Sequence, residues 1–247
     1  MSDETSIVIP CYNEAERLRE DSILDFSGRN PEIRLLFVDD GSSDDTRARL
    51  ETLTAGEESL SLTCLPGNRG KAEAVRQGIN EAFGRGARYA GFWDADLATP
   101  LDEVPRFVEM LDANPDLEVL FGSRVKLLGR TIERRASRHY LGRVAATAIS
   151  ITLGLPVYDT QCGAKLFRGS QTNRNLFAEP FVTRWIFDVE IVARMIRAHQ
   201  KDGGPDPARA ICEVPLREWR DVAGSKVRPV DFLKSMAELL KIRSRYL

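Results

Sequence analysis

Two aspartates, Asp94 and Asp96, stand two residues apart at the end of an apolar run, and they carry the plainest chemistry in this sequence. Alternate residues of an extended strand point to the same face, so the two carboxylates would lie side by side. They would repel each other unless a cation lay between them, and Mg²⁺ and Mn²⁺ take carboxylate oxygens together with substrate phosphates. The pair therefore predicts a site for Mg²⁺ or Mn²⁺, with a helix N-cap as the structural alternative.

Polar or glycine-rich segments also follow the other apolar runs in the first half of the chain. They are Pro10–Glu14, Asp39–Asp44, Gly67–Lys71 and Gly122–Arg124. A carboxylate of the second segment would suit the N–H edge of a nucleotide base, with helix capping as the alternative. The third segment is like a phosphate-binding loop only superficially, because the G-x-x-x-x-G-K-[ST] pattern is absent.

The apolar runs alternate with segments of helical periodicity, and this alternation predicts the fold. The expected strands cover residues 6–10, 34–40, 61–66, 89–96 and 118–124, and the expected helices cover 13–26, 44–54, 70–83 and 101–111. Such alternation forms βαβ units, so we expect an α/β, Rossmann-like fold with a mostly parallel sheet and helices on both faces. Ligands bind such sheets beyond the carboxyl ends of the strands, which is where the polar segments fall.

The second half of the chain is less regular. Its expected elements are a helix over 140–153, a strand or turn over 159–168, a helix over 185–199, a strand over 208–216 and a helix over 230–246. The last helix is basic and amphipathic, with Met236 and Leu240 on its apolar side. We therefore expect a catalytic domain over residues 1–228 and a C-terminal amphipathic basic helix over 229–247.

Composition and charge exclude several classes of protein. Of the 247 residues, 43% are hydrophobic and 29% charged, so the chain is neither collagen-like nor wholly disordered. A net charge of −2 does not suit nucleic-acid binding by bulk charge. Four separated cysteines and two histidines argue against a zinc site or a disulfide framework. With no signal-peptide pattern and no apolar run long enough to span a bilayer, we expect a cytoplasmic protein.

A basic cluster lies between residues 124 and 143. It holds seven Lys or Arg residues against one acid, Glu133, in a chain whose net charge is −2. An anionic acceptor or an anionic membrane surface would find its complement there, and a solvated loop is the structural alternative. The helices expected over 140–153 and 230–246 could lie in a membrane interface, or simply pack on the core.

Several separated motifs resemble the family-2 glycosyltransferases of the GT-A fold, most of all the branch that contains dolichyl-phosphate glucosyltransferases and dolichol-phosphate mannose synthases. The motifs are IVIPCYNE at 7–14, VDDGSSDDT at 38–46, NRGKAEAVR at 68–76, DADLATP at 94–100, DTQCGAKLF at 159–167, RWIFDVE at 184–190 and GSK at 224–226. The resemblance covers residues 5–230 and implies a GT-A fold, a nucleotide-diphosphate-sugar donor, a divalent metal and a polyprenyl or dolichyl phosphate acceptor.

The resemblance also implies roles for individual residues. The base and ribose of the donor would be bound by Pro10, Tyr12, Glu14 and Asp40. Other parts of the donor would be bound by Lys71, Arg220 and Lys226, of which Arg220 and Lys226 would lie near the donor phosphates. Asp94 and Asp96 would hold the metal and the donor diphosphate. Arg124 and Arg138 would hold the acceptor phosphate. Apart from the resemblance, Asp159 and Asp188 are the candidate bases if the acceptor is a hydroxyl. The structural alternative is a turn residue for Asp159 and a helix-start or salt-bridge residue for Asp188.

The residue two places after Asp96, which is Ala98, bears on the donor. The mannose synthases usually carry Gln there, whereas the glucosyltransferase branch has Ala-Thr, as this chain does, and this favours UDP-glucose over GDP-mannose. The implied reaction is an in-line attack of the acceptor phosphate on C1 of the sugar, with inversion and loss of UDP. A phosphate monoester is largely dianionic at neutral pH, so it needs no general base.

Two other functions remain open at this level. The same fold could transfer the sugar to a soluble hydroxyl acceptor, or the chain could be a catalytically silent subunit that binds nucleotide sugars. The intact pair of Asp94 and Asp96 argues against the silent subunit. Because polyprenyl phosphates reside in bilayers, the favoured function brings with it peripheral contact at the cytoplasmic face of a membrane.

Overall fold

The computed structural model describes residues 5–133, 136–221 and 229–247, with side chains described for 5–133, 142–221 and 234–247. Its strands are β1 (Thr5–Cys11), β2 (Ile33–Asp39), β3 (Leu60–Cys64), β4 (Tyr89–Trp93), β5 (Val119–Ser123), β6 (Thr131–Glu133), β7 (Ala164–Arg168), β8 (Ile211–Pro215) and β9 (Glu218–Arg220). Its helices are α1 (Glu20–Arg29), α2 (Thr46–Thr54), α3 (Lys71–Gly84), α4 (Glu103–Ala113), α5 (Ala136–Leu153), α6 (Gln171–Ala178), α7 (Phe187–Asp202), α8 (Pro207–Ala210) and α9 (Pro229–Tyr246).

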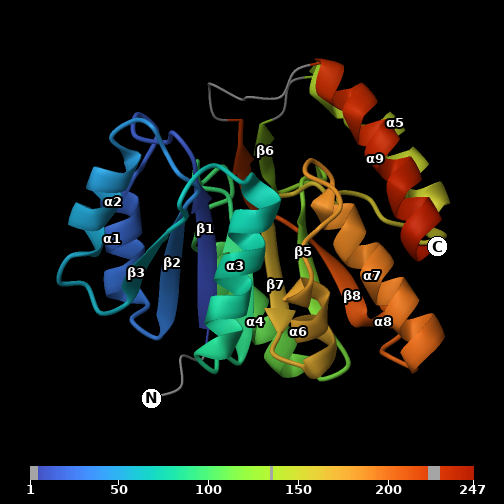
Figure 1. Ribbon diagram of the computed structural model, residues 1–247, viewed down its shortest axis with the longest axis horizontal. Helices are drawn as coiled ribbons and strands as arrows, with labels where there is room; N and C mark the ends of the chain where they lie inside the picture. The colour runs from blue at the N-terminus through green and yellow to red at the C-terminus, as the bar shows by residue number, and fades with distance from the viewer. Residues whose placement is uncertain (1–4, 134–135, 222–228) are drawn as a thin grey trace.

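A seven-stranded sheet runs through the centre of the molecule in the order β3-β2-β1-β4-β7-β5-β8 (Figure 1). All neighbouring strands are parallel except β7, which runs antiparallel between β4 and β5. The expected α/β fold with a mostly parallel sheet is therefore confirmed. The carboxyl ends of β1, β2 and β4 lie next to one another at one edge, as ligand binding at such an edge requires.

Helices cover both faces of the sheet, because each helix buries one apolar side against it. On one face α3, α6 and α7 contribute residues such as Val75 and Phe177 to a continuous core. On the other face α1, α2 and α4 contribute residues such as Ile23 and Phe107. Burial on both faces explains why the central strands read as unbroken apolar runs, such as Ile7–Ile9 in β1.

The first helix begins later than its sequence pattern predicts. Residues 13–19 form a loop, and Asn13 has a φ of 52°, which lies outside the right-handed helical region. Its side-chain oxygen accepts a hydrogen bond from the Ser43 N–H (2.9 Å). The residues after β1 therefore belong to the carboxyl edge of the sheet and connect it to the loop after β2.

Four short elements, α6, α8, β6 and β9, lie outside the sequence-based expectations. The expected strand over 208–216 is wrong in its first residues, which belong to α8, and the strand β8 begins at Ile211. Strands β6 and β9 have three residues each and pair with one another in parallel, apart from the main sheet. Such short strands carry too little pattern to be recognised. Helix α6 did have a signal, since Ser170 is its N-cap and accepts the Asn173 N–H (3.3 Å).

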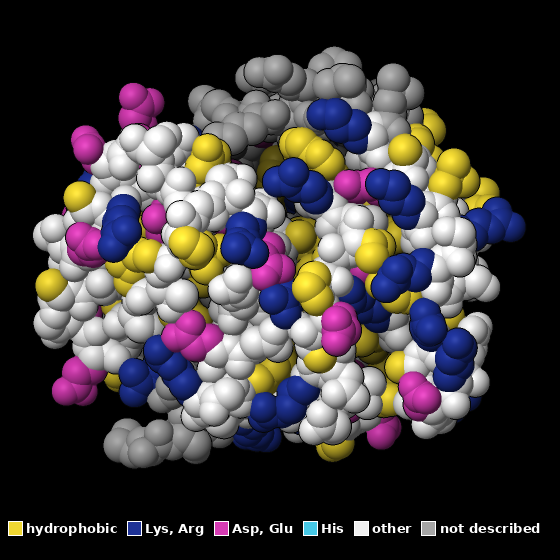
Figure 2. Space-filling view, in the orientation of Figure 1, with side chains coloured by type: hydrophobic (Ala, Val, Ile, Leu, Met, Phe, Trp, Pro, Cys, Tyr) yellow, Lys and Arg dark blue, Asp and Glu magenta, His cyan; other side chains and the backbone are white. Residues whose placement is uncertain are grey.

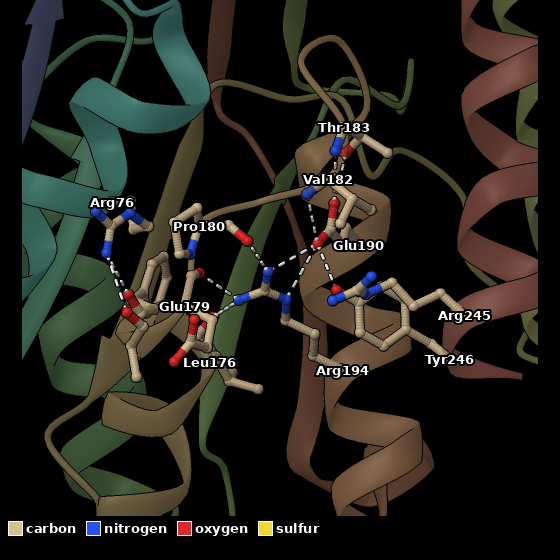
Figure 3. A network of polar contacts seen from close by, with 12 residues as sticks. Arg76, Leu176, Glu179, Pro180, Val182, Thr183, Glu190, Arg194, Arg245 and Tyr246 are labelled. Carbon is tan, nitrogen blue, oxygen red and sulfur yellow. Dashed lines mark hydrogen bonds and ion pairs between the residues drawn. The ribbon is translucent and has the colours of Figure 1, made fainter.

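Polar contacts hold α9 against α7 and the loop before it, on the side of the molecule away from α1 (Figures 1 and 3). The carboxylate of Glu190 on α7 accepts the Tyr246 hydroxyl (2.8 Å) and pairs with Arg194 (2.8 Å). Further along α9, the carboxylate of Glu238 accepts the backbone N–H groups of residues 184–186 at 3.0 to 3.2 Å. Helix α9 is thus attached to α7 through Tyr246 and to the loop before α7 through Glu238.

Candidate active site

Asp94 and Asp96 follow β4, at the edge of the sheet where β1 and β2 also end. Strand β4 ends at Trp93, so strand alternation is not what brings the two carboxylates together. A turn does so instead: the Leu97 N–H donates to the Asp94 carbonyl (3.0 Å), and Leu97 has a φ of 49°. The expectation that strand alternation places the two side chains on one face is therefore wrong, because both residues belong to a tight turn after the strand.

Gly163 makes room for the Asp94 side chain, and the sequence analysis did not single it out as a site residue. The Asp94 N–H donates to the Gly163 carbonyl (2.9 Å). A Cβ atom at Gly163 would lie 1.9 Å from Asp94 Oδ2, which no real contact allows. The segment before β7 thus has to present a glycine to the carboxylate. Its position inside the motif at 159–167 was the available signal.

The surroundings of Asp96 fit a cation. Partial burial and the neighbouring Asp94 carboxylate raise the pKa of Asp96 above its ordinary value, and the Ala98 N–H (3.1 Å) opposes this by donating to Oδ1. A divalent ion between the carboxylates would remove their repulsion. Within the described ranges no group of three or more His, Cys, Asp or Glu side chains could hold a metal. Substrate phosphates and water would therefore complete the coordination.

Lys71, the first residue of α3, reaches the same place. Its ammonium forms an ion pair with the Asp94 carboxylate. Desolvation lowers the pKa of Lys71, but Asp94, Asp188 and Asp96 together raise it above its ordinary value. A lysine held cationic at the start of a helix, beside two carboxylates, is suited to meet a diphosphate.

Asp40 connects the loops after β2 and β3. Its carboxylate accepts the N–H groups of Arg69 (2.7 Å) and Gly70 (2.8 Å), and burial raises its pKa. At Gly41, whose φ is 68°, a Cβ atom would lie 2.5 Å from the Cα of Gly67, so the two loops touch along their backbones. Asp40 thus shapes the edge of the sheet that the resemblance assigns to the base and ribose.

The remaining residues expected at the base and ribose lie at the end of β1. Pro10 belongs to β1, and Tyr12, which is 38% exposed, follows it. Glu14 is buried, and its carboxylate pairs with Arg17 (2.5 Å). Its backbone N–H donates to the hydroxyl oxygen of Thr46 (2.7 Å). All three therefore share the edge of the sheet with Asp40.

Arg124, at the end of β5, forms a two-point ion pair with Asp159. Its Nε and one terminal nitrogen donate to the two carboxylate oxygens at 2.7 and 2.6 Å, and the guanidinium lies 5.4 Å from the Trp219 ring. Although burial lowers the pKa of Arg124, Asp159 raises it well above its usual range. Glu213, in turn, accepts the Asp159 N–H (2.6 Å). The guanidinium plane is thus fixed, and three of its five N–H donors are not used by Asp159.

Of the three other cationic residues predicted at the site, the structure describes the side chain of Arg220 alone. Arg220 on β9 is exposed, pairs with Glu218 (2.7 Å), and its N–H donates to the Ala98 carbonyl (3.1 Å), which brings β9 to the turn that carries Asp96. The side chains of Arg138 and Lys226 lie outside the described residues.

A buried ion pair below the site joins Lys165 of β7 to Asp188 of α7. The two charged groups are 2.6 Å apart, and the side chains are 0% and 7% exposed. Sequence analysis considered Asp188 but gave Lys165 no role. A lysine between the apolar residues Ala164 and Leu166 was the signal, because lysine is almost never fully buried unless it is paired.

Comparison with known proteins identifies the family. Residues 6–173 match the model described as glycosyl transferase family 2. The chain is 32% identical to a dolichyl-phosphate beta-glucosyltransferase of Dictyostelium discoideum, over 98% of this chain and 74% of that protein. It is 31% identical to the human protein of the same name, over 99% of this chain and 76% of that protein.

Solved structures share the fold. Glucosyl-3-phosphoglycerate synthase from Mycobacterium tuberculosis, in complex with Mn²⁺, uridine diphosphate and phosphoglyceric acid, matches 98% of this chain and 79% of its own, with a TM-score of 0.64 at 20% identity. Mannosyltransferase PcManGT from Pyrobaculum calidifontis, in complex with GDP-Man and Mn²⁺, matches 97% of this chain and 62% of its own, with a TM-score of 0.59 at 18% identity. Sequence and fold agree, and the chain belongs to the family-2 glycosyltransferases of the GT-A fold.

Proposed function

We propose that this protein transfers glucose from UDP-glucose to dolichyl phosphate or another polyprenyl phosphate, with inversion at C1 of the sugar. The observation that carries the proposal is that 98% of the chain aligns with a dolichyl-phosphate beta-glucosyltransferase at 32% identity. Ala98 agrees with glucose rather than mannose, as the branch resemblance implies. The fold is shared with a glucosyl-3-phosphoglycerate synthase whose structure contains uridine diphosphate and Mn²⁺.

Asp94 and Asp96 would hold a divalent cation, since their oxygens are hard ligands and a cation would relieve the repulsion between their charges. When bound, the cation neutralises the charge that develops on the departing diphosphate. Lys71 adds a cationic group at the same point. The N-terminus of α3 adds the favourable end of a helix dipole, so this chain supplies its own stabilisation for the leaving group.

An acceptor phosphate fits the charges of the site better than a hydroxyl does. The two carboxylates expected as bases for a hydroxyl acceptor, Asp159 and Asp188, are each paired with a cation at 2.6 Å. Each of these carboxylates is thus engaged by a cation, and neither is positioned by the described contacts as a base for a hydroxyl. Arg124 has N–H donors beyond those that Asp159 uses, in the planar fork that suits phosphate. A phosphate needs orientation rather than a base.

The reaction is tested with the full chain, UDP-glucose, a short-chain polyprenyl phosphate in detergent, and Mg²⁺ or Mn²⁺. We expect a glucosyl phosphate lipid whose anomeric proton coupling in NMR shows the β configuration. Glucosylation of soluble hydroxyl acceptors alone would show that the acceptor is wrong. Binding of UDP with metal, but no turnover of any acceptor, would identify a silent nucleotide-sugar-binding subunit.

We further propose that α5 and α9 together contact an anionic bilayer. Over the described residues, the structure contains no helix that is long and apolar enough to cross a membrane. The two helices lie side by side (Figure 1) and border a groove of about 380 Å³. Ile151 on α5 and Leu240 on α9 flank it and are 76% and 69% exposed. Exposed apolar side chains on adjacent helices are typical of membrane-surface contact.

The charge of these two helices fits anionic lipids. Their described side chains include five cations, namely Arg143, Lys234, Lys241, Arg243 and Arg245. The acid among those described side chains is Glu238, whose carboxylate is occupied by the backbone N–H groups of residues 184–186. Figure 2 shows basic and hydrophobic side chains intermixed on this side of the molecule. Positive charge around an apolar stripe complements the headgroups of anionic lipids.

Replacing both Ile151 and Leu240 by Asp should weaken binding to vesicles that contain phosphatidylglycerol at least ~10-fold, because each exposed side chain would lose ~1.5 kcal/mol of apolar burial. Co-sedimentation measures the binding. Leu24→Asp on α1, which is 40% exposed and lies on the other side of the molecule, is the matched control. Equal loss in both variants, or no loss in the first, would remove α5 and α9 as the contact surface.

Gly163→Ala should lower glucosyl transfer at least ~10²-fold, because the new Cβ would displace the Asp94 carboxylate from its place. The initial rate with saturating UDP-glucose and Mn²⁺ measures the effect. Gly84→Ala in α3, where a Cβ atom meets nothing within 4 Å, is the control and should retain full activity. A fully active Gly163→Ala protein would show that Asp94 does not need this position.

A further inference from the structure

The buried pair of Lys165 and Asp188 has no evident structural need. Lys165 occupies the middle of β7, opposite Phe92 on one side and Phe121 on the other, where its neighbours on the strand are apolar. Its ammonium lies 5.1 Å from the centre of the Phe92 ring and 4.8 Å from that of Phe121, and it donates to the Cys162 carbonyl (2.6 Å). Replacing such a pair by apolar groups often leaves stability unchanged, so stability alone does not explain why it is there.

The position of the pair relative to the site does suggest a reason. Asp188 is the second residue of α7 and is 5% exposed. Lys71 lies over the same Phe92 ring as Lys165, with its nitrogen 5.9 Å from the ring centre. Asp188 is one of the carboxylates that raise the pKa of Lys71, with an effect second to that of Asp94. Positive and negative groups therefore alternate from the core outwards, in the order Lys165, Asp188, Lys71, Asp94.

We infer that Lys165 is a positioning residue, which holds the Asp188 carboxylate in place behind Lys71, so that Lys71 stays at the donor diphosphate when Asp94 turns to a cation. This inference rests on the proposed function. Lys71 pairs with one oxygen of the Asp94 carboxylate, and a metal bound to Asp94 would compete with the ammonium for the same negative charge. A second carboxylate fixed behind Lys71 keeps the ammonium in the site, and the buried lysine supplies the countercharge without which a buried carboxylate would be costly.

The groups around Asp188 agree with this role. Besides the contact with Lys165, the Asp188 carboxylate accepts a hydrogen bond from the Gln161 side-chain amide at 3.5 Å. This contact is long and adds little to the orientation of the carboxylate. The close contact is therefore with Lys165. That ammonium is itself fixed by the Cys162 carbonyl, in the same segment that presents Gly163 to Asp94. One segment thus positions both carboxylates that Lys71 faces.

The test replaces the pair by uncharged groups of nearly the same shape. In Lys165→Met or Asp188→Asn alone, one buried charge loses its partner, so the melting temperature should fall by about 10 °C. In the double variant Lys165→Met/Asp188→Asn no charge is stranded, and most of that loss should be recovered. If the inference is right, the double variant still binds UDP with Mn²⁺ at least ~10-fold more weakly than the natural protein, since Lys71 has lost its second carboxylate.

Lys71→Met supplies an independent arm, because the Lys71 side chain is 42% exposed and its loss should leave folding intact. It should weaken the binding of UDP with Mn²⁺ to the same degree as the double variant, and calorimetry measures both. A stable double variant with natural affinity would show that the pair is only structural. Natural affinity in Lys71→Met would overturn the inference even if the double variant failed to fold. Because UDP binding needs no acceptor, these results are separate from failure of the proposed lipid acceptor.

Discussion

Asp96→Asn is expected to lower the kcat/KM for glucosyl transfer by about 10³-fold, since a metal that neutralises the leaving group contributes several kcal/mol and each ~1.4 kcal/mol is a factor of ten. The substitution keeps the size of the side chain and removes the charge that binds the cation. The Ala98 N–H can still donate to the remaining amide oxygen, so the turn should persist. Initial rates over a range of Mn²⁺ concentrations measure the effect.

The matched control for this variant is Asp116→Asn. Asp116 lies in an exposed turn after the last residue of α4, whereas Asp96 lies before the first residue of that helix. Asp116→Asn should have natural activity. Electron paramagnetic resonance of free Mn²⁺ gives a readout that does not depend on turnover, and Asp96→Asn should leave the ion free in the presence of UDP. Retention of both Mn²⁺ binding and transfer would refute the role assigned to Asp96.

The general position of the site could be predicted from sequence, because it depends on local patterns. Strands that read as apolar runs, each followed by polar residues, place those residues at one edge of a parallel sheet. Asp40, Lys71 and Asp94 all lie there. The same local patterns could not show that Asp40 would be occupied by the N–H groups of Arg69 and Gly70, since that contact joins two loops.

Contacts between distant parts of the chain were beyond the sequence for a physical reason. Strand β7 enters the sheet antiparallel between β4 and β5, and nothing in its own residues records that insertion. The insertion is what brings Gly163 to Asp94 and Lys165 to Asp188. Pairing across strands depends on tertiary packing, which periodicity does not encode.

The side chain of Arg124 shows the same limit from another direction. Sequence places a basic residue after β5, and a charge at that position suits an anionic acceptor. Only the structure reveals that Asp159 binds one edge of its guanidinium and that Glu213 fixes Asp159 in turn. The arginine is therefore already oriented, and if it binds the acceptor phosphate, as we propose, this lowers the entropy that binding has to overcome.

Comparison of two single variants, Arg124→Met and Asp159→Asn, tests whether Arg124 binds the acceptor or only stabilises the fold. Each variant leaves a largely buried charge without its partner, since the two side chains are 15% and 8% exposed, so each should lose ~3–5 kcal/mol of the free energy of unfolding. Their activities should differ. Arg124→Met removes the charged hydrogen bonds to the acceptor phosphate, worth ~1.5–3 kcal/mol each, and should lower kcat/KM for the lipid phosphate about 10²-fold.

Asp159→Asn retains the guanidinium and loses only its orientation, so its kcat/KM for the lipid phosphate should fall no more than ~10-fold, while the KM for UDP-glucose should stay unchanged in both variants. Urea unfolding and steady-state kinetics with each substrate varied in turn provide the two measurements. Equal losses of activity in the two variants, in proportion to their losses of stability, would show that Arg124 serves the fold. A greater loss of activity in Arg124→Met would place its remaining N–H donors on the acceptor. In that case the N–H groups that bind Asp159 serve stability, and the other N–H groups of the same side chain serve acceptor binding.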